Sequence, residues 1–189
     1  MLASIDSTPG QVVADALLVV VVAVNAYLGW SHGLIRRVVT AIGVFAGCFA
    51  ATNLGNPIAS LVHAHSLQAN AWSFVAVFVF VVIVVEVLGA LLNDRLQKIV
   101  VAAFDRIVGT LLGVVIGVAE MLVLFLVAIA ASGPPSTIHR TMSQDINAAT
   151  LSGQVVRLAP IGRTVFGPVL PSNLATHLAE NVVVVAPPV

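Results

Sequence analysis

The sequence predicts an all-α integral membrane protein: a bundle of four transmembrane helices followed by a short amphipathic C-terminal tail. Of the 189 residues, 59% are hydrophobic and only 8% are charged, whereas a soluble domain has about 25% charged residues. The mean hydropathy of +1.08 agrees. The apolar runs are continuous, unlike the alternating strands of a membrane β-barrel, and backbone groups in lipid must pair within a helix. This composition excludes a disordered chain, a charged coiled coil and a typical soluble enzyme.

The charge balance and the cysteine content exclude further classes. Eight Lys and Arg balance eight Asp and Glu, so no basic field is available to attract nucleic acid. The single cysteine, Cys48, lies in an apolar run, which leaves no disulfide framework and no thiolate metal cluster. We expect no metal, no cofactor and no nucleic-acid partner. The expected partners are the lipid bilayer and other membrane proteins or a second copy of the chain.

The first span is predicted over residues 9–30, because a bilayer core about 30 Å thick requires about 20 apolar residues in a helix. Thr8, Pro9 and Gln11 are typical of an N-cap, a first-turn proline and the N3 partner of a capping box. No Lys or Arg precedes Arg36 and no A-x-A site follows the apolar run. We therefore expect no cleaved signal peptide.

Three further spans follow from the same length criterion. The second is predicted over residues 38–54, with the Gly-Asn-Pro sequence at 55–57 as its stop. The third is predicted over residues 72–92 and begins at an interfacial tryptophan. Residues 96–104 have apolar residues at helical spacing and are expected as a helical extension or a short surface helix. The fourth is predicted over residues 107–131 and is ended by a Ser-Gly-Pro-Pro sequence.

These spans divide the chain into a transmembrane domain, residues 1–131, and an extracytoplasmic tail, residues 132–189. The tail has apolar residues in a loosely amphipathic pattern that Pro160 interrupts: Ile146, Leu151, Val155, Leu158, Ile161, Val165, Phe166 and Val169. We expect one or two helices lying on the outer face of the membrane.

The distribution of cationic residues predicts the orientation. Arg36 and Arg37 lie in the first connector, and Arg95, Lys98 and Arg106 lie in the third, while the amino-terminal segment and the second connector have none. Because short cytoplasmic loops are enriched in Lys and Arg, both cationic connectors are expected in the cytoplasm. Both termini are then expected outside the cytoplasm.

Glycines recur at four-residue spacing in three spans. They are Gly29 and Gly33, Gly43 and Gly47, and Gly109, Gly113 and Gly117. Small residues at this spacing let helix backbones approach closely, which predicts a helix interface within one chain or between chains. The alternative is that glycine is simply common in membrane helices.

Two carboxylates, Glu86 and Glu120, lie within predicted spans and are the candidate titrating groups. An ionised group at mid-bilayer costs about 2.5–3.5 kcal/mol on insertion scales, so each should face protein or water. At 1.5 Å per residue, Glu86 lies roughly 10 Å and Glu120 roughly 20 Å from the cytoplasmic edge, which argues against direct pairing. Two interpretations remain, a proton or ion relay and a protonated acid that hydrogen-bonds a neighbouring helix. Asn25 is expected to hydrogen-bond between helices.

No catalytic site is expected. His63 and His65 form an H-x-H pair in the second connector, a pattern that can bind zinc, but no nearby Cys, Asp or Glu completes a site. We therefore expect a surface loop there. The sequence has no identifiable Ser-His-Asp arrangement, phosphate loop or nucleotide fingerprint.

Several short stretches carry a resemblance to a known family. They are Asp15 at the opening of the first span, Gly29-x-x-x-Gly33-Leu34-Ile35-Arg36, and Phe104-Asp105-Arg106-Ile107-Val108-Gly109 at the opening of the fourth. With these residues the chain resembles the colicin V production protein family, over about residues 15–131. His32 departs from the Arg that is frequent at its position in that family.

The resemblance implies a non-enzymatic bacterial inner-membrane protein with four spans, linked by name to colicin V production or export. Some relatives resemble this chain as the membrane part of a periplasmic serine protease, but we expect no protease domain here, because fewer than sixty residues follow residue 131. Two hypotheses follow. The first is an accessory or structural membrane protein that acts through partner contacts. The second is a small proton- or ion-coupled transporter or channel that uses Glu86 and Glu120.

Overall fold

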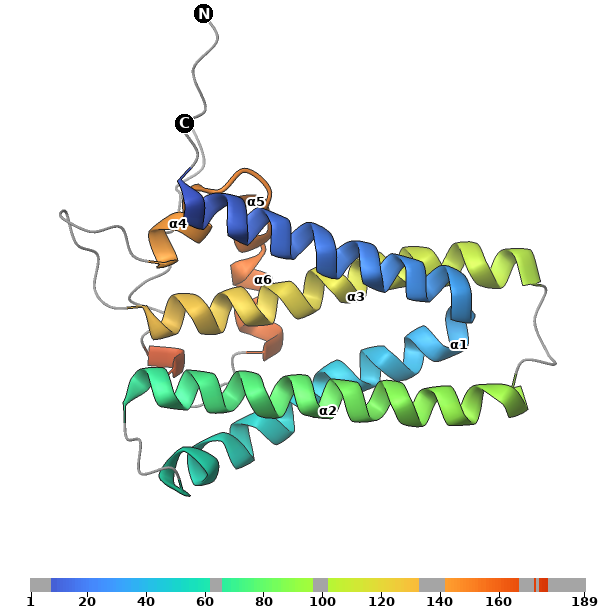
Figure 1. Ribbon diagram of the computed structural model, residues 1–189, viewed down its shortest axis with the longest axis horizontal. Coiled ribbons are helices and arrows are strands. Elements are labelled where there is room, and N and C mark those ends of the chain that lie inside the picture. The colour runs from blue at the N-terminus through green and yellow to red at the C-terminus, as the bar shows by residue number, and fades with distance from the viewer. Residues whose placement is uncertain are drawn as a thin grey trace, which may run out of the picture.

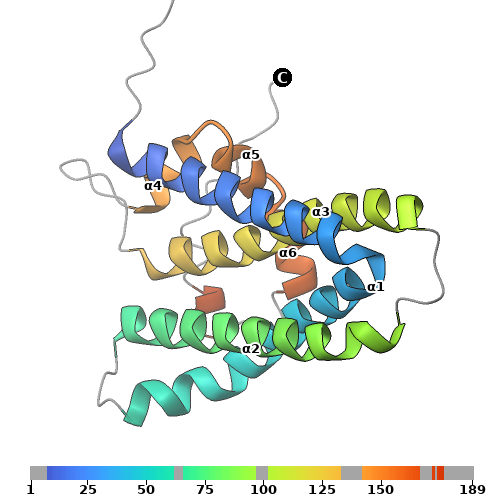
Figure 2. The same ribbon diagram turned by 45° about the vertical axis from the view of Figure 1, so that its right-hand side comes forward.

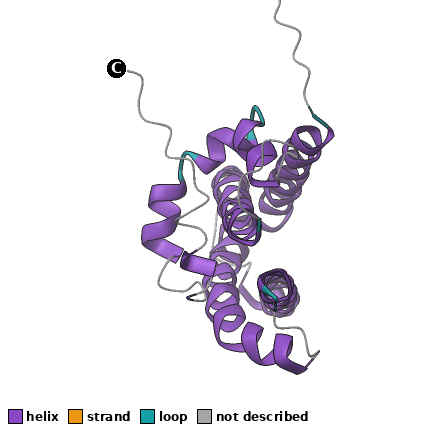
Figure 3. Ribbon diagram, turned by 90° about the vertical axis from the view of Figure 1, so that its left-hand side faces the viewer, coloured by secondary structure: helices purple, strands orange, loops and turns teal. Residues whose placement is uncertain are grey.

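A computed structural model of the protein describes residues 8–61, 66–96, 102–132, 142–166, 172 and 174–176. Its helices are α1 (Pro9–Leu61), α2 (Leu67–Leu96), α3 (Ala102–Ala131), α4 (Met142–Ala148), α5 (Ser152–Val156) and α6 (Ala159–Phe166). The described part of the chain contains helices and no strand (Figure 3). The predicted all-α class is confirmed.

Four helical segments are long and apolar enough to cross a membrane: Pro9–Leu34, Arg36–Gly55, Leu67–Gly89 and Phe104–Ala131. Successive segments run in opposite directions, so that the start of α1 and the end of α3 lie at one end of the bundle (Figure 1). The bend in α1, the end of α2 and the start of α3 lie at the other end. The predicted four-helix membrane architecture is confirmed, although each span differs somewhat from its predicted bounds.

The first predicted connector, residues 31–37, is replaced by a bend at one residue. Helix α1 is helical on both sides of Gly33, whose φ of 77° and ψ of −176° are not helical. Only glycine adopts such a conformation without steric cost. The backbone N–H of Leu34, just after the bend, donates to Asp105 Oδ1 of α3 at 2.8 Å. A single glycine with a capping carboxylate therefore turns the chain where the sequence suggested a loop.

The predicted stop at residues 55–57 is also wrong, because α1 continues to Leu61 with Pro57 inside it. Gly55 faces α2, and a Cβ there would lie 3.6 Å from the backbone nitrogen of Phe74. This glycine thus provides room for a neighbouring helix and does not end its own. Proline is tolerated in membrane helices because the surroundings satisfy the backbone group that it leaves unpaired.

The starts of the helices follow from local capping. Thr8 and Gln11 form the predicted capping box: the Thr8 backbone N–H donates to Gln11 Oε1 at 3.1 Å, and the Gln11 N–H donates to Thr8 Oγ1 at 3.5 Å. Helix α2 begins earlier than residue 72, because the Ala69 N–H donates to Ser66 Oγ at 3.1 Å and so caps a helix from Leu67. Helix α3 likewise begins before the predicted residue 107.

The tail folds back on the bundle as three short helices that contact α3 (Figure 2). Its buried apolar residues are Ile146, Ala149, Val155, Val156, Ala159 and Leu174. Of the other residues in the predicted amphipathic pattern, Leu151, Leu158 and Ile161 are exposed. The chain turns between α4, α5 and α6, so no single helical face runs through the segment, and Pro160 lies in the first turn of α6. The side chains of Val165, Phe166 and Val169 lie outside the described residues.

Candidate functional site

The site is framed by a close contact between the first half of α1 and α3. A Cβ added at Gly29 would collide with the Gly109 carbonyl oxygen, and one at Gly113 would collide with that of Asn25. A Cβ at Gly117 would lie 2.9 Å from the Cα of Val22. The glycines of the fourth span therefore lie against backbone of α1 within one chain, which is how small residues allow membrane helices to associate.

The second half of α1 uses its own pair of glycines against α2. A Cβ at Gly43 would lie 2.7 Å from Val85 Cγ1, and one at Gly47 would lie 3.1 Å from Phe78 Cδ2. These neighbours are side-chain atoms, so this contact is less close than the contact between α1 and α3. The bend at Gly33 thus lets one long helix pack with α3 before the bend and with α2 after it.

Arg37 lies at the centre of a polar network between these helices. Its side chain is completely buried. The guanidinium donates through Nη1 to Asn25 Oδ1 at 3.0 Å and through Nη2 to Glu86 Oε1 at 2.7 Å. Since Asn25 lies before the bend and Glu86 lies on α2, Arg37 connects both halves of α1 with α2.

Glu86 is surrounded by cationic and hydroxyl donors. Besides Arg37, its Oε1 accepts a hydrogen bond from Thr40 Oγ1 at 2.5 Å. Its Oε2 lies 3.3 Å from Arg36 Nε, and the Glu86 side chain is 20% exposed. Charged groups within a membrane pair with one another, and Glu86 is the partner of two arginines.

Glu120 joins the same network from α3. Asn25 Nδ2 donates to Glu120 Oε2 at 2.8 Å, and both residues are buried. Glu86 and Glu120 are therefore connected through Arg37 and Asn25, and within the described residues no direct hydrogen bond joins them. The Asn25 side chain makes the predicted bond between helices.

The network corrects the assignment of Arg36 and Arg37 to a cytoplasmic loop. Arg37 has no exposed side-chain area and the Arg36 side chain is only 12% exposed, because the helix resumes directly after the bend and both guanidiniums turn toward Glu86. Arg106 is exposed, whereas the side chains of Arg95 and Lys98 lie outside the described residues. A glutamate within a span together with arginines near a span end is the sequence signal that could have predicted this pairing.

The two aspartates of the sequence motifs cap neighbouring segments. Asp105 accepts from the Leu34 N–H at the bend. Asp15 accepts from the backbone N–H of Leu151 at 3.1 Å and of Ser152 at 2.7 Å, where α5 begins. Asp15 therefore attaches the tail to α1, and Asp105 fixes the bend.

The sequence model of the colicin V production protein family matches residues 14–160, which is more than half of the chain. The chain belongs to the colicin V production protein family. No curated protein and no solved structure is matched. The matched region extends beyond residue 131, where the sequence resemblance ended, and takes in α4 and α5. The attachment of the tail to Asp15 thus lies within the matched region.

The other motif residues of this family member lie around the bend. Leu34 is half-buried, and Phe104 and Arg106 are exposed at the start of α3. Exposure of Phe104 at a span end is compatible with contact with lipid, since apolar residues that face a bilayer need no protein partner. Among the motif residues with charged side chains, Asp15, Asp105 and Arg36 make contacts that hold segments together.

A cavity of about 460 Å³ lies apart from the network, between the start of α2 and the end of α3. Its lining is mostly apolar, with Gln68 and Ser132 as polar members, and no residue of the network lines it. Within the described ranges, no group of three His, Cys, Asp or Glu could hold a metal ion. His63 and His65 lie outside the described residues.

Proposed function

We propose that this member of the colicin V production family is a non-enzymatic accessory protein of the bacterial inner membrane. In this role it supports colicin V production or export and envelope function. The observation that supports it most is the backbone contact of α1 with α3 at Gly29, Gly109 and Gly113. A bundle held by backbone contacts, with Glu86 ion-paired to Arg36 and Arg37 inside it, has the character of a rigid scaffold.

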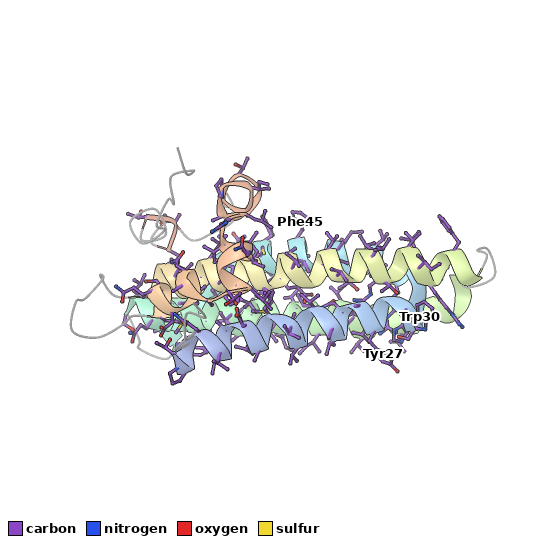
Figure 4. All side chains as sticks on the ribbon, turned by 90° about the horizontal axis from the view of Figure 1, so that it is seen from above. Tyr27, Trp30 and Phe45 are labelled. Atoms are coloured by element: carbon purple, nitrogen blue, oxygen red, sulfur yellow. The ribbon has the colours of Figure 1, made fainter. Side chains whose placement is uncertain are left out.

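The proposal includes partners within the membrane. Much of the apolar surface faces outward: Tyr27 and Trp30 on the first half of α1 are exposed and point away from the bundle (Figure 4). Lipid, other membrane proteins or a second copy of the chain would cover this surface.

The orientation that we propose places both termini outside the cytoplasm. Thr8 Oγ1 donates to Asp145 Oδ1 at 2.8 Å, which holds the start of α1 and the tail at the same end of the bundle. The exposed Arg106 lies at the opposite end, which the positive-inside rule assigns to the cytoplasm. The test is a fusion at Val189 to a reporter that works only in the cytoplasm. Activity of that reporter would contradict this orientation.

Complementation tests the accessory role. The chain would be expressed in a colicin V-producing bacterium that lacks its own family member, and toxin in the medium would be measured by growth inhibition of a sensitive strain. We expect the wild-type chain to restore toxin release and Gly113→Leu to fail, because leucine cannot fit against Asn25. Failure of the wild-type chain at normal membrane levels would contradict the proposal.

A second candidate function is a small proton- or ion-coupled transporter, favoured by the connection of Glu86 with Glu120 inside the bundle. The double variant Glu86→Gln/Glu120→Gln distinguishes the two functions. If this variant inserts at wild-type levels and restores toxin release as fully as the wild-type chain does, the relay is eliminated.

A further inference from the structure

We infer that Arg36, Arg37, Glu86 and Glu120 form an electrically neutral ion quartet within the membrane, in which Glu120 is ionised and acts on Arg37 through the Asn25 amide. Glu120 is then the place where the bundle binds a proton. This inference goes beyond the accessory role, and it holds whether or not the protein transports anything.

The orientation of the Asn25 amide follows from its two neighbours. A guanidinium has only donors, so the group that meets Arg37 Nη1 at 3.0 Å is the amide oxygen. The amide nitrogen therefore faces Glu120 Oε2 at 2.8 Å and the Val21 carbonyl oxygen at 3.1 Å. The positive end of the amide dipole points at the carboxylate and its negative end points at the cation. Asn25 thus transmits the attraction between Glu120 and Arg37 without direct contact.

The count of charges shows why Glu120 is ionised. Arg36 and Arg37 share one carboxylate, Glu86, which also accepts from Thr40. Guanidinium groups stay protonated in proteins, so a neutral Glu120 would leave one uncompensated positive charge inside the bundle. An unpaired charge in the membrane is costly, whereas an ionised Glu120 brings the quartet to zero net charge.

The charged groups of the quartet interact strongly because they are buried. Arg37 has no exposed area, Asn25 is 7% exposed and Glu120 is 9% exposed, so solvent screens their interaction little. Asn25 donates to Glu120 directly, and Arg37 and Glu86 follow in the same chain of hydrogen bonds. The charge of Glu120 on α3 therefore affects the polar contacts of both α1 and α2.

Binding of a proton by Glu120 changes the quartet from neutral to singly positive. The Asn25 amide then loses the anion that orients its nitrogen, and Arg37 loses the more distant of its two counter-charges. Since the bond from Arg37 to Asn25 joins the two halves of α1 across Gly33, the proton acts on a contact that spans the bend.

A charge-balance cycle tests the quartet in the full-length protein, reconstituted in phospholipid nanodiscs. Glu120→Gln leaves the quartet positive, Arg36→Gln leaves it negative, and the double variant is neutral. We expect each single variant to unfold at a lower temperature than wild type. The double variant should unfold at a higher temperature than Glu120→Gln alone, although no direct contact joins these two residues. Additive losses in the double variant would overturn the inference.

A matched pair and a spectroscopic readout complete the test. Asp15→Asn combined with Arg36→Gln also preserves the net charge of the chain, but Asp15 binds the tail, so these two changes should be additive. Infrared spectra at neutral pH should show an ionised carboxylate that disappears in Glu120→Gln and persists in Glu120→Asp. A protonated-acid band in wild type that disappears in Glu120→Gln would overturn the inference, even if the variants fold poorly.

Discussion

Replacing Gly113 with alanine tests the contact between α1 and α3 with the smallest possible change. The added Cβ would collide with the Asn25 carbonyl oxygen and lie 3.2 Å from the Cα of Ala26. These are backbone atoms, so no side-chain rotation relieves the contact and the helices must separate. Overpacking costs about 1–3 kcal/mol, and alanine recovers up to about 1 kcal/mol in helix propensity. We expect the free energy of unfolding to fall by about 1–2 kcal/mol.

The assay is thermal unfolding in one mild detergent, followed by circular dichroism. A loss of that size should lower the melting temperature by about 2–8 °C for a chain of this length. Gly55→Ala is the matched control, because its Cβ would lie 3.6 Å from the nearest atom of Phe74, an ordinary contact. Gly55→Ala should melt at or above the wild-type temperature. If Gly113→Ala melts at the same temperature as Gly55→Ala, the close approach of the backbones is not what limits this position.

Three further predictions concern the polar contacts. Asp105→Ala removes the acceptor for the Leu34 N–H and should cost about 0.5–2 kcal/mol of unfolding free energy, as loss of a helix cap does; an unchanged melting temperature would refute the capping role. Asp15→Ala releases the start of α5, so limited proteolysis should cut the tail faster than in wild type while the melting of the bundle changes little. Arg37→Gln should lower the free energy of unfolding by about 3–5 kcal/mol, the range for breaking a buried ion pair. Arg36→Gln should lower it less, because the Arg36 side chain is partly exposed. Equal losses would show that burial does not set the strength of the two ion pairs with Glu86.

The sequence was sufficient for the features that depend on local composition. Apolar runs of sufficient length predicted four membrane helices, and the Thr8–Gln11 capping box predicted the start of the first. The predicted stop at residues 55–57 agrees with the end of the apolar span at Gly55, but the helix itself continues through Pro57 to Leu61. The bend at Gly33 was expected as a loop, since the sequence does not show that one glycine can turn the chain.

The polar network was only half predicted, for a physical reason. Glu86 and Glu120 were recognisable as isolated charges within spans, but their partners depend on tertiary contacts. Arg37 was expected in a loop. Its contact with Glu86, 49 residues later, forms only because α1 bends at Gly33. In the tail, the helical spacing of Leu151 and Leu158 did not show where the chain turns between short helices, and both residues are exposed.

Helix α1 packs against α3 before the bend at Gly33 and against α2 after it, and this arrangement has a consequence for biosynthesis. Arg37 is synthesised 49 residues before Glu86, and Asn25 is synthesised 95 residues before Glu120. At about 5–20 residues per second, the arginine waits about 2–10 s and the asparagine about 5–19 s for its partner. The second half of α1 therefore cannot settle in lipid with its guanidinium ion-paired to Glu86 when it leaves the ribosome. Its lateral release from the insertion machinery should depend on the arrival of α2, which makes the first two helical elements a single unit of membrane insertion.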